Sequence, residues 1–191
     1  MDTPRLIFLL FSATAVIYAI LIYNRLISLK HNVKKAWGNI DVLLKQRHDE
    51  LPKLIATCKQ YMQHEQETLR QVTEARSRVA KAQSRTDMPA LDLAEDQLRA
   101  GLGQLFAVVE NYPELKADEH FQHLQGRISN LENTISDRRE FYNEVVNINN
   151  IRIEQFPDLL IAHLFHFEPH RLLSFRKHEI KDINVQQLFK G

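Results

Sequence analysis

The sequence contains few of the residues that close turns, form disulfides or bind metals. Five glycines and six prolines occur in 191 residues, so the composition favours helix over a turn-rich β fold. Cys58 is the single cysteine, which excludes an internal disulfide and a paired-cysteine metal site. Beyond a short hydrophobic N-terminal segment, the length suffices for one domain of ordinary size. We therefore expect one all-α domain.

Neither sign of charge is in clear excess. The chain has 25 Lys+Arg and 24 Asp+Glu, with a formal net charge of +1 at pH 7. No dense basic run occurs in the sequence, although such a run is typical of proteins that bind nucleic acid. Nucleic acid is therefore not an expected partner.

One uninterrupted hydrophobic run lies near the N-terminus. Leu6 to Tyr23 reads LIFLLFSATAVIYAILIY, in which Ser12 and Thr14 can bond to the preceding helical turn. At a rise of about 1.5 Å per residue, Arg5 and Arg25 are roughly 30 Å apart, the thickness of a hydrocarbon core. Residues 1–25 are predicted to form a transmembrane anchor. The residues expected to contact lipid are Leu6, Ile7, Phe8, Val16, Ile17, Ile20, Leu21 and Tyr23.

A cleaved signal peptide is the alternative for this run, because Ala13-Thr14-Ala15 has the small-x-small form of a cleavage site. Cleavage there would leave Leu6 to Phe11 as the apolar region, with eight further apolar-run residues beyond the cut. A signal peptide normally ends its apolar region before the cut. Retention of the segment is therefore the favoured interpretation.

Basic residues are distributed unevenly about the run. Arg5 precedes it, whereas a basic juxtamembrane group and two further basic residues follow it. The group comprises Arg25, Lys30, Lys34 and Lys35, and the further residues are Lys45 and Arg47. Basic residues next to a span favour the cytoplasmic side. We expect the following domain on the cytoplasmic side of a bacterial inner membrane.

Apolar residues with helical spacing predict an antiparallel helical bundle over residues 26–167. From Val33 to Val79 they recur in steps of three and four, so the membrane helix should continue unbroken to about Gln83, kinked at Pro52. The tail, residues 168–191, has weaker periodicity and can be extended. The other expected helices are Ala90–Asn111, Ala117–Gln155 and the short segment DLLIAHLF after Phe156-Pro157.

No catalytic, cofactor or metal site is expected. His64-Glu65 starts like a zinc-protease motif, but Thr68 stands where the second histidine is needed. Gly101-x-Gly103 lacks the third glycine and preceding strand of a phosphate loop, and is better explained by close helix packing. A histidine group near the tail is interrupted by Pro169. Its members are His163, His166 and His170.

Several charged residues fall on or beside the apolar stripes. They are Arg47, Glu65, Arg76, Glu110 and Arg139. A buried unpaired charge costs several kcal/mol, so we expect these residues to pair across helices and fix their register. A small-ligand site and lone surface charges are the alternatives.

The arrangement of these residues resembles that of the LemA family. The matching elements are Tyr23-Asn24, Ala36-Trp37, Ile40-Asp41-Val42, Leu44-Lys45, Arg47, Asp49, Pro52, His64-Glu65, Ala75-Arg76, ENYPELKADEHFQHLQ at Glu110 to Gln125, Arg139, Phe141-Tyr142-Asn143, Asn150 and Phe156-Pro157. The resemblance extends from the membrane helix to about Phe167. It adds Asp49 and Asn143 to the predicted polar set, whereas Cys58 and MPALDLAEDQ depart from the usual family pattern.

The resemblance implies an N-terminal anchor, an all-helical antiparallel bundle and no established catalytic activity. Family members are often associated with membrane metalloprotease or envelope-stress genes. We therefore expect a membrane-anchored scaffold or adaptor that recruits or encloses such a membrane protein. We also expect a homo-oligomer, because the membrane helix gives every copy the same orientation. The alternative function is a signalling module that binds a small ligand in the bundle, and an enzyme is the least favoured class.

Overall fold

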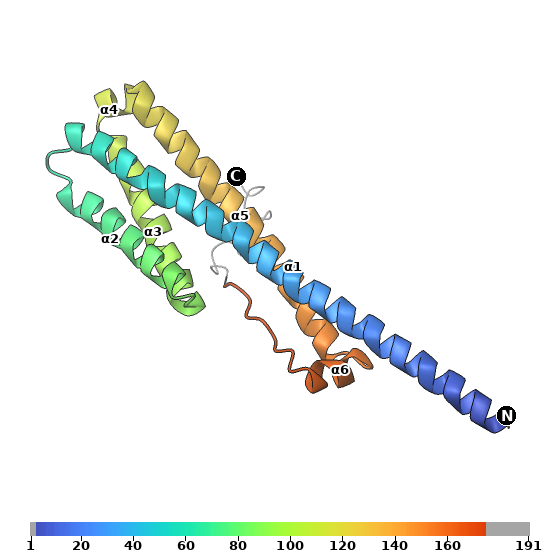
Figure 1. Ribbon diagram of the computed structural model, residues 1–191. Coiled ribbons are helices and arrows are strands. Elements are labelled where there is room, and N and C mark those ends of the chain that lie inside the picture. Colours follow the sequence, from blue (N-terminus) through green and yellow to red (C-terminus); the bar gives the residue numbers. More distant parts are fainter. Residues whose placement is uncertain (1–2, 175–191) are drawn as a thin grey trace, which may run out of the picture. The chain divides into compact units, whose positions relative to one another are not determined.

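The computed structural model describes residues 3–174, which form six helices and no strand. The chain divides into two compact units. Unit 1 contains the residues up to Arg47 and Ser129–Leu172, and unit 2 contains His48–Ile128 and the residues after Leu172. The helices are α1 (Thr3–Tyr61), α2 (Gln66–Ser84), α3 (Met88–Val109), α4 (Pro113–Ala117), α5 (Glu119–Glu154) and α6 (Asp158–Leu164) (Figure 1).

Helix α1 contains both the apolar run and the first helix of the bundle, so the prediction of a continuous helix is confirmed up to Tyr61. Pro52 lies inside it. The apolar run is long enough to cross a membrane, and only 6% of its most apolar window is buried. Burial begins at Ile22 and Leu26, which are 7% and 0% exposed.

The prediction that this helix extends to Gln83 is wrong. It ends at Tyr61, and residues 62–65 form a break before α2. Met62 is buried there and its N–H donates to the Cys58 carbonyl at 2.9 Å. The next residues, Gln63 to Gln66, carry no apolar side chain. Reversal at this point lets the apolar stripe of α2 pack in unit 2, and such burial supplies most of a helix's stability.

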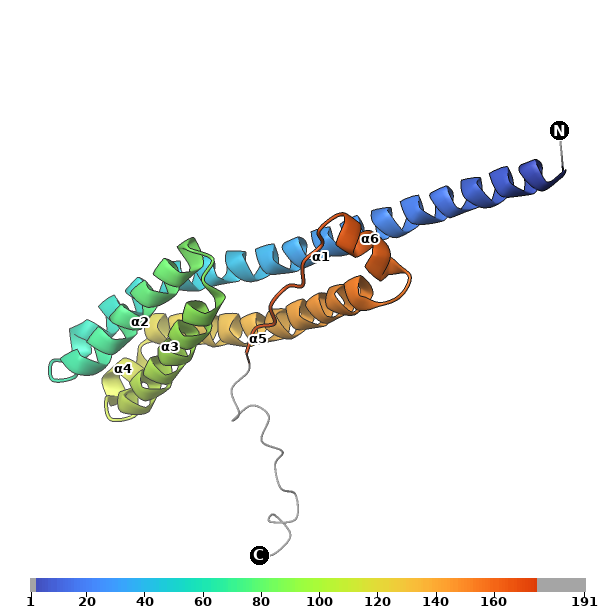
Figure 2. The same ribbon diagram turned by 90° about the horizontal axis from the view of Figure 1, so that it is seen from below.

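In unit 1, the part of α1 from Ile22 to Arg47 lies antiparallel to the C-terminal part of α5 (Figure 2). The Trp37 and Tyr142 rings lie 5.9 Å apart. Nearer the apolar run, Ile22 and Leu26 share a core cluster with Ile153 of α5 and Ala162 of α6. Val146 of α5 is fully buried. The remaining buried apolar residues of this pair are Val33, Ala36, Ile40, Leu44 and Ile135.

The segment after α6 is non-helical through Ser174, as its weak periodicity predicted. The Asn150 side chain holds it by donating to the His170 carbonyl at 2.8 Å and accepting from the His170 N–H at 2.9 Å. The Tyr142 hydroxyl donates to the Arg171 carbonyl at 3.2 Å. The rest of the predicted tail, residues 175–191, lies outside the described residues. Its apolar residues Ile180, Ile183, Val185, Leu188 and Phe189 are among those that the structure does not describe.

In unit 2, the antiparallel helices α2 and α3 are joined by a short turn. Asp87 caps α3 by accepting from the Ala90 N–H at 3.1 Å, which satisfies one of the free donors at the helix start. A Cβ added at Gly101 would lie 3.4 Å from a methyl group of Val72 on α2. Gly103 has open space, with no atom of the described residues within 4 Å of such a Cβ. Close helix packing therefore occurs at Gly101.

We predict opposite effects for substitutions at these two glycines. Gly103→Ala should raise the free energy of unfolding by up to about 1 kcal/mol, because alanine favours the helix interior. Gly101→Leu should lower it by about 1–3 kcal/mol, because the larger side chain must displace Val72. Urea unfolding followed by far-UV circular dichroism measures both. Equal stability of Gly101→Leu and the unmodified chain would contradict close packing at this position.

Candidate functional site

The most deeply buried charge predicted from the sequence forms an ion pair between helices. Arg47 of α1 is 1% exposed, and its Nη1 donates to Glu132 Oε1 of α5 at 2.6 Å. Both residues belong to unit 1. A buried arginine requires such a partner, since burying a charge alone is costly. The pair therefore fixes the register of α1 against α5.

A second cross-link, in unit 2, uses Glu50 rather than the predicted Asp49. Asp49 is exposed, whereas the Glu50 side chain is 8% exposed. Arg127 Nη2 of α5 lies 2.9 Å from Glu50 Oε1, and Lys53 Nζ donates to the same oxygen at 3.2 Å. The residue that reaches the interior is therefore Glu50, which follows the motif residue Asp49 on the helix.

Arg76 binds the helix on which it packs. Its Nε donates to the His48 carbonyl of α1 at 2.9 Å, and its Nη2 lies 2.7 Å from His48 Nε2. A guanidinium group can only donate, so this contact requires an unprotonated Nε2 on His48. The spacing of residues in the sequence did not predict that His48 would be the partner of Arg76.

Polar contacts also join the ends of the unit 2 helices. The Tyr61 hydroxyl, at the end of α1, donates to Asp118 Oδ2 at 3.1 Å. Asp118 also accepts from the Phe121 N–H at 2.7 Å, and this backbone bond, assisted by Tyr61, lowers the pKa of the Asp118 carboxyl. Glu65 is half-buried before α2 and accepts from the Tyr112 hydroxyl at 3.4 Å.

The other predicted residues differ in their exposure. Glu110 is exposed and pairs with the exposed Lys116, so it is not part of a buried network. It lies at the C-terminal cap of α3, one position beyond the buried Val109, which explains why it looked like a stripe residue. Arg139 is buried on α5 and Asn143 is half-buried.

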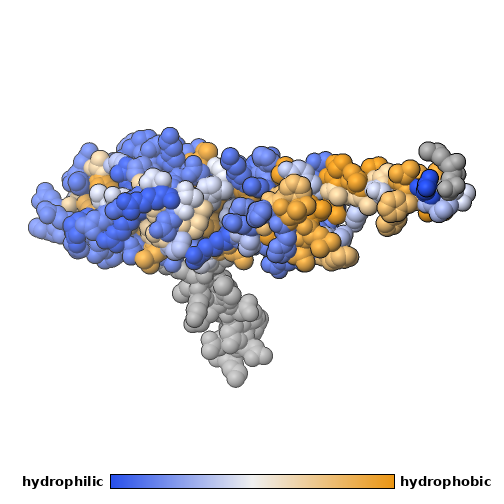
Figure 3. All heavy atoms as spheres, turned by 60° about the horizontal axis from the view of Figure 1, so that its bottom comes forward, coloured by the Kyte–Doolittle hydropathy of each residue, from blue (hydrophilic) through white to orange (hydrophobic). Residues whose placement is uncertain are grey.

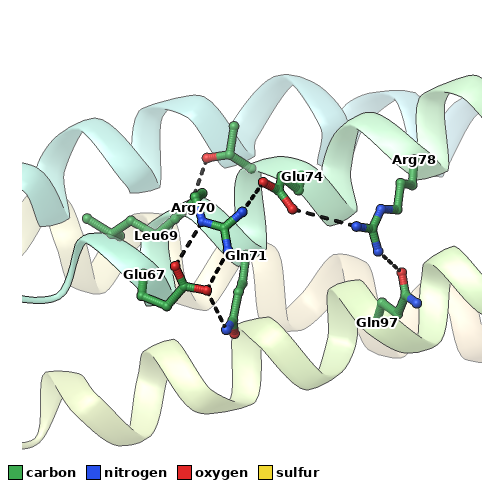
Figure 4. A network of polar contacts seen from close by, with 8 residues as sticks. Glu67, Leu69, Arg70, Gln71, Glu74, Arg78 and Gln97 are labelled. Atoms are coloured by element: carbon green, nitrogen blue, oxygen red, sulfur yellow. Dashed lines mark hydrogen bonds and ion pairs between the residues drawn. The ribbon is translucent and has the colours of Figure 1, made fainter.

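An exposed chain of charged and polar side chains runs along α2 (Figure 4). Arg70 contacts Glu67 at 2.7 and 2.8 Å and also pairs with Glu74. Arg78 lies 3.6 Å from Glu74 and donates to Gln97 of α3 at 2.7 Å. The Arg70 guanidinium lowers the pKa of Glu67. Because these side chains are solvated, the contacts between them contribute little to the free energy of unfolding and form a polar outer face on α2.

An open groove of about 670 Å³ lies beside the turn between α1 and α2. Its lining includes Lys59, Met62, Leu69 and Arg70. None of the charged residues proposed for a ligand site lines this groove. Within residues 3–174, no group of three His, Cys, Asp or Glu residues is placed to hold a metal ion.

Aromatic residues gather where α1 leaves the apolar run. The Tyr23 ring lies 4.7 Å from that of Phe165 and 6.1 Å from that of Phe167. Lys30 Nζ lies 5.9 Å from the centre of the Phe167 ring. Tyr23 is half-buried, whereas the other predicted anchor residues are exposed. The juxtamembrane basic residues are exposed as well, namely Arg25, Lys30, Lys34 and Lys35.

We predict that the Arg47–Glu132 pair is architectural. Arg47→Ala should lower the free energy of unfolding by about 3 kcal/mol, because it leaves Glu132 without this partner. Replacing both residues with methionine should restore much of that loss, since an apolar pair needs no charge compensation. Glu110→Ala is the matched surface control and should cost no more than about 1 kcal/mol. Urea unfolding of the full chain in mild detergent measures all four proteins.

One other result would indicate that Arg47 binds a ligand rather than stabilises the bundle. That result is a loss of function in Arg47→Ala with unchanged unfolding. A double variant as unstable as Arg47→Ala would equally contradict a simple pair.

Comparison with known proteins gives matches over most of the chain. Residues 36–187 match the LemA family. Two relatives in Paramagnetospirillum magneticum, named Magnetosome protein MamQ 1 and Magnetosome protein MamQ 2, are each 34% identical over 67 residues. That stretch is 35% of this chain and 25% of each relative, so the likeness spans about a quarter of their length. The family match covers well over half of the sequence, and the chain therefore belongs to the LemA family.

Proposed function

We propose that this LemA-family protein is a membrane-anchored helical scaffold that holds a membrane protein partner at the bilayer. The observation that carries the proposal is the exposed apolar run of α1, which continues without a break into the bundle. Exposed apolar surface of this length is unfavourable in water and favourable in a hydrocarbon core. The anchor and the scaffold would thus be parts of one helix.

The burial pattern supports a retained span. The most apolar window of α1 is only 6% buried, unlike a core helix. Cleavage after Ala15 would leave Val16 to Leu21 as an exposed apolar end on the bundle. Ile22 and Leu26, just beyond, are part of the core. An intact span removes this exposed end from water.

Charge supports a cytoplasmic bundle. Arg25, Lys30, Lys34 and Lys35 are exposed within the first turns after the run, against Arg5 before it. Such a distribution favours retention of the basic side in the cytoplasm. We propose this orientation in a bacterial inner membrane.

Binding of a protein partner fits the chemistry better than catalysis or small-ligand binding. The LemA family is not a known enzyme family. The charged residues considered for a ligand site already have intrachain partners, as in Arg47–Glu132 and Glu110–Lys116. A membrane metalloprotease or an envelope-stress component is the partner class that the family resemblance suggests.

Self-association is part of the proposal. An anchored helix gives every copy the same orientation, which reduces the rotational freedom lost on association. Ala15 and Ala19 are four residues apart on the exposed run and permit close approach of two spans. Cyclic symmetry about the membrane normal would close such an assembly.

We predict that the full-length protein, isolated in native nanodiscs, contains more than one copy and a membrane protein at a fixed ratio. Native mass spectrometry measures both numbers. The control is Ile17→Arg, which places a charge in the exposed run and should cost about 3 kcal/mol of insertion free energy. Because Ile17 is exposed, the bundle should stay folded.

The proposal requires that the Ile17→Arg variant is absent from the membrane fraction and no longer co-purifies with the partner. A single copy without a stoichiometric partner, across a wide range of concentrations, would contradict the scaffold. Retention of the same partner by a soluble Ile17→Arg protein would contradict the role of the anchor.

A further inference from the structure

The short helix α6 and the residues flanking it expose an unusual amount of apolar surface. Phe156 is 76% exposed, Leu160 61%, Leu164 67% and Phe165 52%. We call these four residues the α6 patch. Exposed large apolar side chains that gather in one place mark an interaction surface rather than an ordinary solvated face.

The α6 patch lies next to the end of the apolar run, within the same unit. Ala162 of α6 shares a core cluster with Ile22 and Leu26 of α1, and Ile161 and Phe167 pack against that cluster. Leu26 follows Tyr23, the last residue of the run, by less than one helical turn. In the space-filling view, apolar surface continues from α1 across this region (Figure 3).

The polar groups of α6 are arranged for a poorly solvated setting. Its one acidic residue, Asp158, is 5% exposed, and Arg152 Nε lies 3.3 Å from its carboxylate. The helix therefore exposes no carboxylate, and its exposed polar side chain is His163. Glu154 and Glu168, on either side of α6, are exposed and would remain in the aqueous layer.

The surroundings have the composition of a membrane interface. Tyr23, Phe165 and Phe167 form the aromatic cluster, and Lys30 lies over the Phe167 ring. Aromatic rings with basic side chains beside them are typical of the headgroup level of a bilayer. Arg25, two residues after the end of the run, adds a second exposed cation.

We propose that the α6 patch inserts into the lipid headgroup region as a second membrane contact, so that unit 1 is held by the α1 span and by α6. This inference rests on the proposed anchoring by α1. Continuity of the patch with the apolar run favours lipid over a second copy of the chain as the occupant. Contact at two points would limit the tilt and rotation of unit 1 about its span.

Depth-dependent fluorescence quenching tests the proposal in full-length protein reconstituted into phosphatidylcholine–phosphatidylglycerol vesicles. An environment-sensitive fluorophore is attached at Leu164→Cys in the patch, at Leu10→Cys in the run, or at Asp137→Cys on an exposed position of α5. Burial raises the pKa of the native Cys58 thiol to about 11, so near neutral pH it stays protonated and reacts slowly. The unsubstituted chain serves as the labelling blank.

We expect the Leu164→Cys label to lose fluorescence with nitroxide lipids labelled near the headgroup and to be protected from aqueous iodide. The Leu10→Cys label should be quenched most by nitroxides deep in the acyl chains. The Asp137→Cys label should be quenched by iodide alone. Circular dichroism of each variant verifies that the helices are intact.

Other results separate the failure of α6 from the failure of the anchor. Iodide quenching of Leu164→Cys, with deep-lipid quenching of Leu10→Cys, would overturn the α6 contact and leave the span in place. Protection of Leu164→Cys from both quenchers, increasing with protein density, would assign the patch to a second copy and overturn lipid contact. Iodide quenching of Leu10→Cys would refute the anchor, and lipid quenching of Leu164→Cys would then show α6 as a membrane contact by itself, which would overturn the proposal of two contacts.

Discussion

Helix α1 has to satisfy two environments with one backbone, and the arrangement of unit 1 depends on that constraint. From Leu6 to Tyr18 the apolar run is exposed on all sides, as lipid contact requires, whereas from Ile22 onward one stripe is buried against protein. Leu26, which is fully buried, lies in the cluster where α5 and α6 meet α1. No helix break separates the two environments. A force or displacement at the span would therefore pass directly into the bundle.

The helices pack through repetitive aliphatic stripes, which by themselves permit more than one register. Directional polar contacts limit that freedom. The Arg47–Glu132 pair acts within unit 1, and Glu50–Arg127 and Arg76–His48 act within unit 2. Ion pairs and hydrogen bonds that are buried or partly buried contribute more to specifying an arrangement than to stabilising it. The proposed scaffold role would need that specificity, because a protein partner would have to recognise a fixed surface.

The periodic stripes made the helices predictable, including the continuous passage from the apolar run into the bundle. The reversal at residues 62–65 was not predictable in the same way, because no glycine or proline marks it and the apolar spacing resumes beyond it. Arg47 could be recognised as an interior charge, but its partner Glu132 lies on a helix whose register only the folded chain defines. The interior position of Glu50, next to the motif residue Asp49, depends on the same register. The apolar composition of the segment DLLIAHLF is visible in the sequence, but only the folded chain defines which of its side chains are exposed, such as Leu160 and Leu164.

The central claim is that α1 crosses the bilayer once and delivers the bundle to the cytoplasmic side. The most direct measurement compares two reporters fused in turn after Gly191 of the full-length chain, alkaline phosphatase and green fluorescent protein, produced in bacterial cells. The account predicts a fluorescent fusion in the membrane fraction and an inactive phosphatase fusion. An active phosphatase with a dark fluorescent protein would place the bundle across the membrane and contradict the orientation. Fluorescence in the soluble fraction would contradict the anchor itself.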